Sequence, residues 1–289
     1  MDQQLKVFVT VVDKRNFSRA AEELHMTQPA VSQYIKSLEE TLGTKLLERN
    51  NRSVEMNKAG EIVYHHAIEL LNLYSKMNYL LDDLTNRASG KLTIGASYTY
   101  GEYVLPHVIA SIRKKYPLIT PAVTIGNSRE IGDLVYSHQL DVGIIEGDYP
   151  ARDMKVDSFT QDEMVIVAAP SHKNVDHGSI LENEMWIVRE EGSGTREASE
   201  KMWELLSIDP SQKMAFGSTQ LIKESVEAGI GIGILSKWTI RKELKLGTLK
   251  ILELPNFRYT RTFSILMRSP FQTKVLEVFL DHVHSHHKT

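Results

Sequence analysis

The sequence has no cysteine among its 289 residues, which excludes disulfide bonds, thiolate catalysis and cysteine-based zinc sites. It has no run of 18 apolar residues, and its first residues lack the basic segment and apolar core of a signal peptide. We therefore expect no membrane partner and a cytoplasmic location. With 42% hydrophobic and 25% charged residues, the composition is that of a globular protein, and the length predicts two or three folding units.

An excess of positive charge is also missing, because the formal net charge is -3 at pH 7. Residues 1–57 carry eight lysines and arginines and eight aspartates and glutamates. Overall charge therefore does not indicate a nucleic-acid partner. A DNA-binding surface in this chain must arise from where its charges are placed.

Residues 1–57 predict three short helices followed by a hairpin. The first helix has apolar residues at i, i+3, i+4 and i+7 from Leu5. Ser18 is expected to cap the second helix and Thr27 the third, which Gly43 ends. Residues 46–56 then read as a β-hairpin with an asparagine turn.

The exposed face of the third helix and the hairpin tip are polar or basic. Short polar groups and a cation suit hydrogen bonding to base edges and phosphates in a major groove. A three-helix subdomain with a merely solvated face is the alternative, and the basic hairpin favours a winged-helix DNA-binding domain. The residues that contact DNA in this hypothesis are Thr27, Gln28, Pro29, Ser32, Gln33, Lys36, Arg49 and Arg52.

Residues 58–86 predict one long helix, for which Asn57 can provide the cap. Seven positions follow a heptad spacing of four and three: Val63, Ala67, Leu70, Tyr74, Met77, Leu81 and Leu84. This seam could pack against its own domain. A rod that joins two globular units has little of its own chain to contact, so we favour dimerisation with a second copy. A two-fold dimer would present paired winged helices to a palindromic site.

From Ala88 onward, short β-rich runs alternate with helical stretches, which is typical of an α/β domain. The segment Thr93–Ser97 recurs in similar form as Thr124–Ser128, and each copy ends a strand and begins a helix. Further strands are expected at 141–145, 164–169, 185–188, 231–235 and 262–267. Helices are expected at 102–115, 128–137, 196–207, 219–228 and 271–286. Parallel strands with helical crossovers place a ligand site at the carboxyl ends of the strands.

Four strand-to-helix loops carry small polar side chains and favour an anion site. Helix N-termini offer unpaired N–H groups, and the glycines of Gly192–Thr195 let backbone approach a ligand closely. A carboxylate, sulfate or phosphate metabolite fits these donors, whereas capping of each helix is the alternative for any single loop. The candidate effector-binding residues are Ser97, Tyr98, Thr99, Asn127, Ser128, Thr195, Ser218 and Thr219.

Motifs in both halves of the chain resemble the LysR-type transcriptional regulator family, in family order from about residue 2 to about residue 285. In the first half they are 17–21, 27–32 and 47–60; in the second half they are 90–95, 140–147 and 229–234. Two positions depart from the family pattern. Gln33 stands where arginine is common and Leu47 where phenylalanine is frequent, and the first departure removes one contact to phosphate or guanine.

The resemblance implies a multidomain α plus α/β fold: a winged helix-turn-helix at 1–57, a dimerising linker helix at 58–88 and a periplasmic-binding-protein-like α/β domain at 89–289. That domain would have one lobe at 89–161 and 267–289 and a second lobe at 162–266. Crossovers near 160–162 and 266–268 would form a hinge.

The resemblance also implies what the protein binds. Family members are bacterial regulators, usually homotetramers on a partly palindromic promoter site in double-stranded DNA. They activate a divergent gene, acting with RNA polymerase, and repress their own. A small anionic effector would bind between the lobes, where Ser97, Thr99 and Thr195 match positions that contact effectors in relatives.

Other function classes are less favoured. A phosphate-binding enzyme would need a Walker loop, which Gly192–Thr195 does not match. No nucleophile–base–acid set is apparent, so we expect neither a catalytic residue nor a cofactor. The winged helix and the missing signal peptide count against a solute-binding protein. The histidines at 282, 284, 286 and 287 favour a solvated helix end over a metal site, and adjacent His65 and His66 make a poor chelate.

Overall fold

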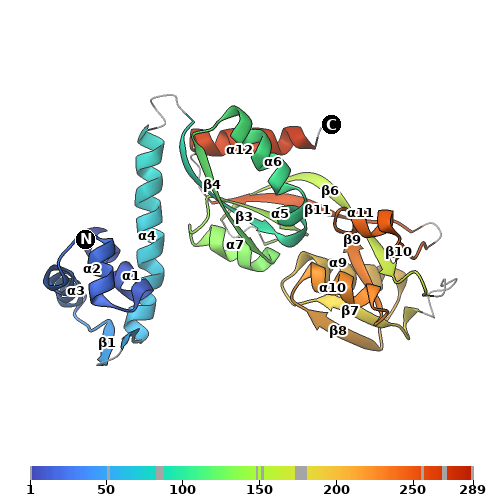
Figure 1. Ribbon diagram of the computed structural model, residues 1–289, viewed down its shortest axis with the longest axis horizontal. Coiled ribbons are helices and arrows are strands. Elements are labelled where there is room, and N and C mark those ends of the chain that lie inside the picture. The colour runs from blue at the N-terminus through green and yellow to red at the C-terminus, as the bar shows by residue number, and fades with distance from the viewer. Residues whose placement is uncertain are drawn as a thin grey trace. The chain divides into compact units, whose positions relative to one another are not determined.

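The computed structural model describes residues 2–50, 53–82, 88–147, 149–150, 153–172, 181–254, 257–268 and 272–287. The chain divides into two compact units, Met1–Asp82 and Asp83–Thr289. Figure 1 shows the elements of each unit. Within the described ranges, no helix combines the length and the apolar character needed to cross a membrane.

The first unit contains a three-helix domain, a hairpin and a long helix. Its elements are α1 (Asp2–Lys14), α2 (Phe17–Glu23), α3 (Gln28–Leu42), β1 (Leu47–Asn50), β2 (Ser53–Met56) and α4 (Lys58–Asp82). Apolar faces of the helices meet in one core, where Phe8 and Ile35 are fully buried. As predicted, α3 ends at Gly43, whose φ of +69° suits a residue without a side chain. The predicted hairpin is also confirmed, with Asn50 paired to Ser53.

Helix capping differs in detail from the expectation. Asn16, and not Ser18, caps α2, because its side-chain oxygen accepts a hydrogen bond from the backbone N–H three residues on at 3.0 Å. Thr27 occupies the cap position of α3, but its side chain forms no cap hydrogen bond with a described residue. Asn57 acts as expected, since its Oδ1 accepts a hydrogen bond from Gly60 N at 2.9 Å.

The heptad seam of α4 changes character along the helix. Ala67 is only 1% exposed and, with the half-buried Val63, packs against the core of its own unit. The expectation that this helix has little of its own chain to contact is therefore wrong for these two positions. Further along, Leu70, Tyr74 and Met77 are 54%, 50% and 47% exposed. The side chain of Leu81 and the whole of Leu84 lie outside the described residues.

The second unit is built on one continuous sheet with the strand order β4-β3-β5-β11-β6-β9-β7-β8, and β10 pairs with β6. Its first elements are β3 (Gly90–Ser97), α5 (Tyr98–Tyr103), α6 (Leu105–Lys115), β4 (Ile119–Gly126), α7 (Ser128–Tyr136), β5 (Val142–Glu146) and β6 (Lys155–Ala168). They are followed by β7 (Met185–Arg189), α9 (Gly194–Leu206), β8 (Gln212–Phe216), α10 (Thr219–Glu227), β9 (Ile232–Ser236), α11 (Lys237–Leu246), β10 (Lys250–Ile251), β11 (Tyr259–Met267) and α12 (Lys274–His286).

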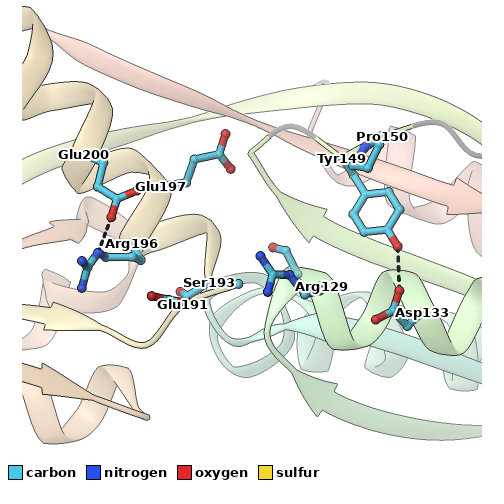
Figure 2. A pocket seen from close by; sticks show the side chains of 11 residues that line it. Arg129, Asp133, Tyr149, Pro150, Glu191, Ser193, Arg196, Glu197 and Glu200 are labelled. Carbon is cyan, nitrogen blue, oxygen red and sulfur yellow. Dashed lines mark hydrogen bonds and ion pairs between the residues drawn. The ribbon is translucent and has the colours of Figure 1, made fainter.

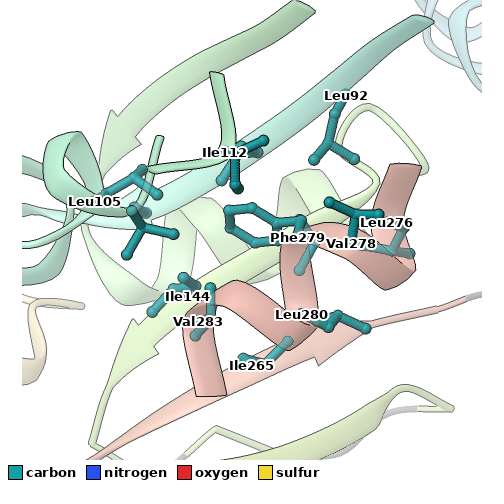
Figure 3. Packing of buried hydrophobic residues seen from close by; sticks show 14 of the residues in the cluster. Leu92, Leu105, Ile112, Ile144, Ile265, Leu276, Val278, Phe279, Leu280 and Val283 are labelled. Atoms are coloured by element: carbon teal, nitrogen blue, oxygen red, sulfur yellow. The ribbon is translucent and has the colours of Figure 1, made fainter. Parts of the chain in front are cut away.

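The sheet carries two lobes, each with helices on both faces. In lobe one, α6 and α12 cover one face of β3, β4 and β5, and α7 covers the other. Figure 3 shows Phe279 of α12 beside Ile112 of α6 in this core. In lobe two, α9 packs on one face of β7 and β9, while α10 and α11 pack on the other. The parallel pairs β3–β4, β3–β5, β7–β8 and β7–β9 place the carboxyl ends of these strands toward the junction between the lobes.

The long strands β6 and β11 run through both lobes. Asp162 of β6 pairs with Arg261 of β11 at the crossover, close to the expected 160–162. The second crossover lies earlier than the expected 266–268. Tyr259 packs on the core of lobe two, whereas alternate residues from Phe263 onward already belong to the core of lobe one.

Most predicted elements of this unit are present near their expected bounds. The helix expected at 102–115 is instead two helices, α5 and α6, because Pro106 cannot donate a backbone hydrogen bond to the turn before it. The short strands β8 and β10 and the helix α11 were not predicted.

Candidate functional site

Five of the residues predicted to contact DNA line one groove on the surface of α3. The groove has a volume of about 590 Å³ and is lined by Gln28, Pro29, Ser32, Gln33, Lys36, Glu39, Lys45 and Leu47. Gln28 Nε2 donates a hydrogen bond to Ser32 Oγ at 3.0 Å, and Lys36 Nζ lies 3.7 Å from Glu40 Oε1. These local contacts are exposed, so the side chains can exchange them for contacts with a partner.

A buried carboxylate beneath this groove was not predicted. Glu39 is 5% exposed and accepts hydrogen bonds from Leu46 N at 2.9 Å and Lys45 Nζ at 2.8 Å. Burial opposes ionisation of Glu39, but these contacts lower its pKa below the ordinary value. Glu39 thereby fixes the start of the hairpin to the end of α3. In the sequence, the signal for a buried Glu39 was its position directly after the apolar Leu38, on the buried side of the helix.

The basic hairpin tip is only partly described. The side chain of Arg49 and the whole of Arg52 lie outside the described residues. Their expected phosphate contacts stay predictions.

Three predicted effector residues of the second unit converge on Glu146, the last residue of β5, two of them on its carboxylate. Thr99 N donates a hydrogen bond to Glu146 Oε1 at 2.8 Å, and Thr195 Oγ1 donates to Oε2 at 3.3 Å. Ser128 Oγ donates to the backbone oxygen of Glu146 at 2.9 Å. The N-termini of α5, α7 and α9 therefore meet at this residue, and α9 comes from the opposite lobe.

Arg261 of β11 supplies the cation at this meeting point. Its Nη1 lies 2.5 Å from Glu146 Oε2, and its Nη2 lies 2.8 Å from Asp162 Oδ2. The guanidinium also donates hydrogen bonds to the hydroxyls of Thr99 and Thr195, both at 2.9 Å. We call these five residues, Thr99, Glu146, Asp162, Thr195 and Arg261, the interlobe cluster. Both lobes and both crossing strands contribute to it.

The charges of the interlobe cluster are buried and do not balance. Glu146, Asp162 and Arg261 are at most 4% exposed, and two carboxylates face one guanidinium. Burial opposes ionisation of Glu146, but Arg261 and the hydrogen bond from Thr99 hold its pKa below the ordinary value. Burial raises the pKa of Asp162 despite its contact with Arg261, and the Glu146 charge adds to the shift.

Three other predicted residues surround a second ion pair beside the cluster. Arg189 Nε lies 2.7 Å from Glu190 Oε2, and the guanidinium lies 4.4 Å from the ring centre of Tyr98. Thr219 Oγ1 accepts a hydrogen bond from Arg189 Nη1 at 3.2 Å. Asn127 caps α7, and its Nδ2 lies 3.5 Å from Glu190 Oε1. Tyr98 and Asn127 are in lobe one, so these contacts also join the lobes.

The last two predicted effector residues differ from each other. Ser97 is buried and occupies the cap position of α5, two residues before the cluster residue Thr99. Ser218 accepts a hydrogen bond from Leu221 N at 3.2 Å and acts as the cap of α10. For Ser218 the structure records only the capping role.

The charged residues of the interlobe cluster were not predicted, because they lie on strands and not on the hydroxyl-bearing loops. Glu146 follows four buried residues of β5, and Arg261 lies inside β11. A charged residue at the end of an apolar strand such as β5 is seldom fully buried unless it is paired. That pattern was a signal for Glu146, whereas Arg261 stands between two threonines and gave no such signal.

A polar cleft of about 720 Å³ lies between the lobes next to the interlobe cluster. Figure 2 shows Arg196 and Glu200 of α9 on one side and Arg129 and Asp133 of α7 on the other. Its other lining residues are Ser128, Tyr149, Pro150, Glu191, Gly192, Ser193 and Glu197. Because Ser128 both lines the cleft and binds the backbone of Glu146, the cleft adjoins the cluster. The lobes also touch here, where Arg129 N donates to Gly192 O at 3.2 Å.

The histidine-rich end of the chain packs on lobe one and is not merely solvated. His287 Nε2 lies 3.2 Å from the hydroxyl of Tyr100, and its ring contacts Phe159. Burial lowers the pKa of His287. In the described part of the chain, no group of three or more histidine, aspartate or glutamate side chains is arranged to hold a metal ion.

Comparison with known proteins identifies both units. Residues 85–288 match the LysR substrate binding domain family, and residues 3–61 match the family described as bacterial regulatory helix-turn-helix protein, lysR family. HTH-type transcriptional regulator CysL of Bacillus subtilis (strain 168) is 35% identical over 291 residues, which cover 99% of this chain and 97% of that protein.

Solved structures share the fold. Full-length CbnR complexed with its target DNA has a TM-score of 0.74 and 19% identity and covers 99% of this chain and 99% of its own. The regulatory domain of CcmR from Synechocystis PCC6803 has a TM-score of 0.63 and 26% identity and covers 70% of this chain and 99% of its own. The chain therefore belongs to the LysR family and is a DNA-binding transcriptional regulator, not an enzyme, with an effector-binding domain.

Proposed function

We propose that this regulator binds a partly palindromic promoter site as a dimer or tetramer and responds to a small anionic metabolite bound between the two lobes of its effector-binding domain. The observation that carries the proposal is the convergence of Thr99 and Thr195, from opposite lobes, on one buried carboxylate. The same N–H and hydroxyl groups suit the oxygens of a small carboxylate, sulfate or phosphate.

The DNA-contacting part of the proposal rests on α3. Gln28, Ser32, Gln33 and Lys36 share one exposed groove, and their side chains suit base edges and phosphates. The structural relative CbnR was solved with its target DNA, which supports the same use of this unit. Arg49 and Arg52 at the hairpin tip would hold phosphates beside the groove.

The oligomeric part rests on α4. Past the buried Ala67, Leu70, Tyr74 and Met77 leave an apolar stripe of α4 exposed. A second α4 would bury this stripe and set two copies of α3 for the half-sites of a palindrome.

The effector part rests on the interlobe cluster and the cleft beside it. The CcmR regulatory domain was solved in complex with 2-PG, which supports a small ligand for this domain. A ligand shifts regulation only through its differential affinity for two arrangements of the protein. The crossing strands β6 and β11, which join the lobes, are where such arrangements would differ.

The test is the Thr195→Val variant, which keeps the shape of the side chain and removes its hydroxyl. We expect effector affinity to fall by about 1–3 kcal/mol, while operator affinity without effector stays nearly unchanged because Thr195 is in the other unit. Promoter occupancy mapped in cells identifies the operator, and a reporter driven by it, titrated with candidate metabolites, gives the response.

Thr93→Val is the matched control. Thr93 Oγ1 donates a hydrogen bond to Asp141 Oδ2 at 2.7 Å within lobe one and takes no part in the interlobe cluster. An equal response of wild type, Thr195→Val and Thr93→Val to the inducing metabolite would place the effector elsewhere.

A further inference from the structure

We infer that Glu146 sets the anion affinity of the interlobe site: its carboxylate occupies the position that the anionic group of an effector takes, and the two exchange. This rests on the proposed function, in which a small anion binds between the lobes. Glu146 is thus a specificity-determining residue supplied by the chain itself.

The contacts of Glu146 are those of a bound ligand and not those of a surface ion pair. Its two carboxylate oxygens accept from a backbone N–H in lobe one, at Thr99 N, and from a hydroxyl in lobe two, at Thr195 Oγ1. Arg261 completes the set. These are the donors that would otherwise be available to a small oxyanion.

The backbone at the start of α9 also lies close to Glu146. A side chain at Gly194 would place its Cβ 2.2 Å from the backbone oxygen of Glu146. Glycine in this loop therefore allows the N-terminus of α9 to approach the end of β5. The close approach that the loop sequence predicted for a ligand is made here to a residue of the chain.

The charge of the interlobe cluster favours an effector anion that replaces the Glu146 carboxylate over one that binds in addition to it. Glu146 and Asp162 already outnumber Arg261, and all three groups are buried. A further anion would place three negative charges around one guanidinium, in surroundings that strengthen their repulsion. The effector's anionic group therefore takes over the contacts of Glu146.

A route for the exchange adjoins the cluster. Glu146 is the last residue of β5, and Gly147 follows with a φ of +79°, a conformation that glycine adopts without strain. The cleft of about 720 Å³ begins at Ser128, which is bonded to the backbone of Glu146. It has room for the displaced side chain.

The test compares sulfate and phosphate binding by full-length wild type and the Glu146→Gln variant. Calorimetry and tryptophan fluorescence can both be used, because Trp186, Trp203 and Trp238 all lie in the effector-binding unit. Glutamine keeps the shape and an oxygen for Thr99 N but removes the competing charge. We expect Glu146→Gln to bind one of these anions about tenfold more tightly than wild type.

Two further variants exclude a general charge effect. Glu163→Gln, one residue from the cluster and paired with Lys237 at 2.8 Å, removes the same charge from the surface and should stay within about twofold of wild type. Asp162→Asn removes the other carboxylate but leaves Glu146 on its contacts, so any gain in anion affinity should be smaller than that of Glu146→Gln. If Glu146→Gln does not fold, a gain of about tenfold in Asp162→Asn, with Glu146 still in place, would overturn the inference, and a clearly smaller gain would support it.

Three results would overturn the inference: no gain in Glu146→Gln, an equal gain in Glu163→Gln, or a gain in Asp162→Asn as large as that of Glu146→Gln. If any of these occurs while Thr195→Val still weakens the response to the inducing metabolite, the proposed function stands without the exchange. If Thr195→Val also has no effect, both fail.

Discussion

Arg261→Met removes the only cation of the interlobe cluster while keeping much of the apolar length of the side chain. The ion pairs at 2.5 Å to Glu146 and 2.8 Å to Asp162 are lost, as are the hydrogen bonds to Thr99 and Thr195. Two buried carboxylates are left without a counter-charge. Breaking a buried ion pair by removing one partner costs about 3–5 kcal/mol, and we expect the effector-binding unit to lose stability in that range at pH 7.

The defect of Arg261→Met should depend on pH in a defined direction. Without the guanidinium, burial and mutual repulsion raise the folded-state pKa values of Glu146 and Asp162 above their ordinary values of 4.5 and 3.8. Groups with raised folded-state pKa values favour the folded state when protonated, below those ordinary values, and lose this contribution as the pH rises through the raised values. The variant should therefore be closest to wild type below about pH 4 and furthest from it at neutral pH.

Urea unfolding followed by tryptophan fluorescence measures this loss, because all three tryptophans report on the effector-binding unit. Arg258→Met is the control on the same segment. Arg258 is 81% exposed and lies 3.6 Å from Glu163, so its replacement should change stability by no more than about 0.5 kcal/mol. A loss below about 1 kcal/mol for Arg261→Met at pH 7, or a loss that is independent of pH, would refute the central role of Arg261.

Two further predictions concern the first unit. Glu39→Gln should lower the free energy of unfolding by about 1–3 kcal/mol at pH 7. The difference from wild type should shrink as the pH falls through the lowered pKa of Glu39. Thermal unfolding measures this loss of stability, and an equal loss in the exposed Glu40→Gln control would contradict the prediction. Leu70→Lys combined with Met77→Lys should separate dimers that pair through α4, because two charges would be buried at a cost of several kcal/mol. Sedimentation velocity compares this double variant with Asn72→Lys, a control on the opposite side of the helix. A double variant that still pairs through α4 would refute dimerisation through the heptad seam.

The sequence predicted what depends on short-range patterns. The helical periodicity of α1 and α3, the glycine stop at Gly43 and the hairpin are local signals, and the structure contains each of them. Prediction failed where two neighbouring residues could serve equally well as a helix cap. Asn16 and Ser18 are both good caps, and only the position of the preceding turn decides between them.

The interlobe cluster could not be predicted from the sequence for a different reason. The hydroxyls of Thr99 and Thr195 could be found from their loops, but the partners that bind them come from strands far away in the sequence. Arg261 lies 66 residues from Thr195 and 162 from Thr99 along the chain. Whether α4 packs on its own unit was equally a question of tertiary contacts, which is why Ala67 and Leu70 of one heptad seam have different surroundings.

In the proposed function, α3 reads the promoter that this protein regulates. The most direct measurement is genome-wide promoter occupancy in cells, followed by footprinting on the occupied fragment, for wild type and for Gln28→Ala combined with Gln33→Ala. Wild type should occupy one or a few discrete promoters with a two-fold related pair of half-sites. The double variant should lose that preference, at about 1–3 kcal/mol for each base contact. An unchanged footprint and unchanged affinity in the double variant would contradict it.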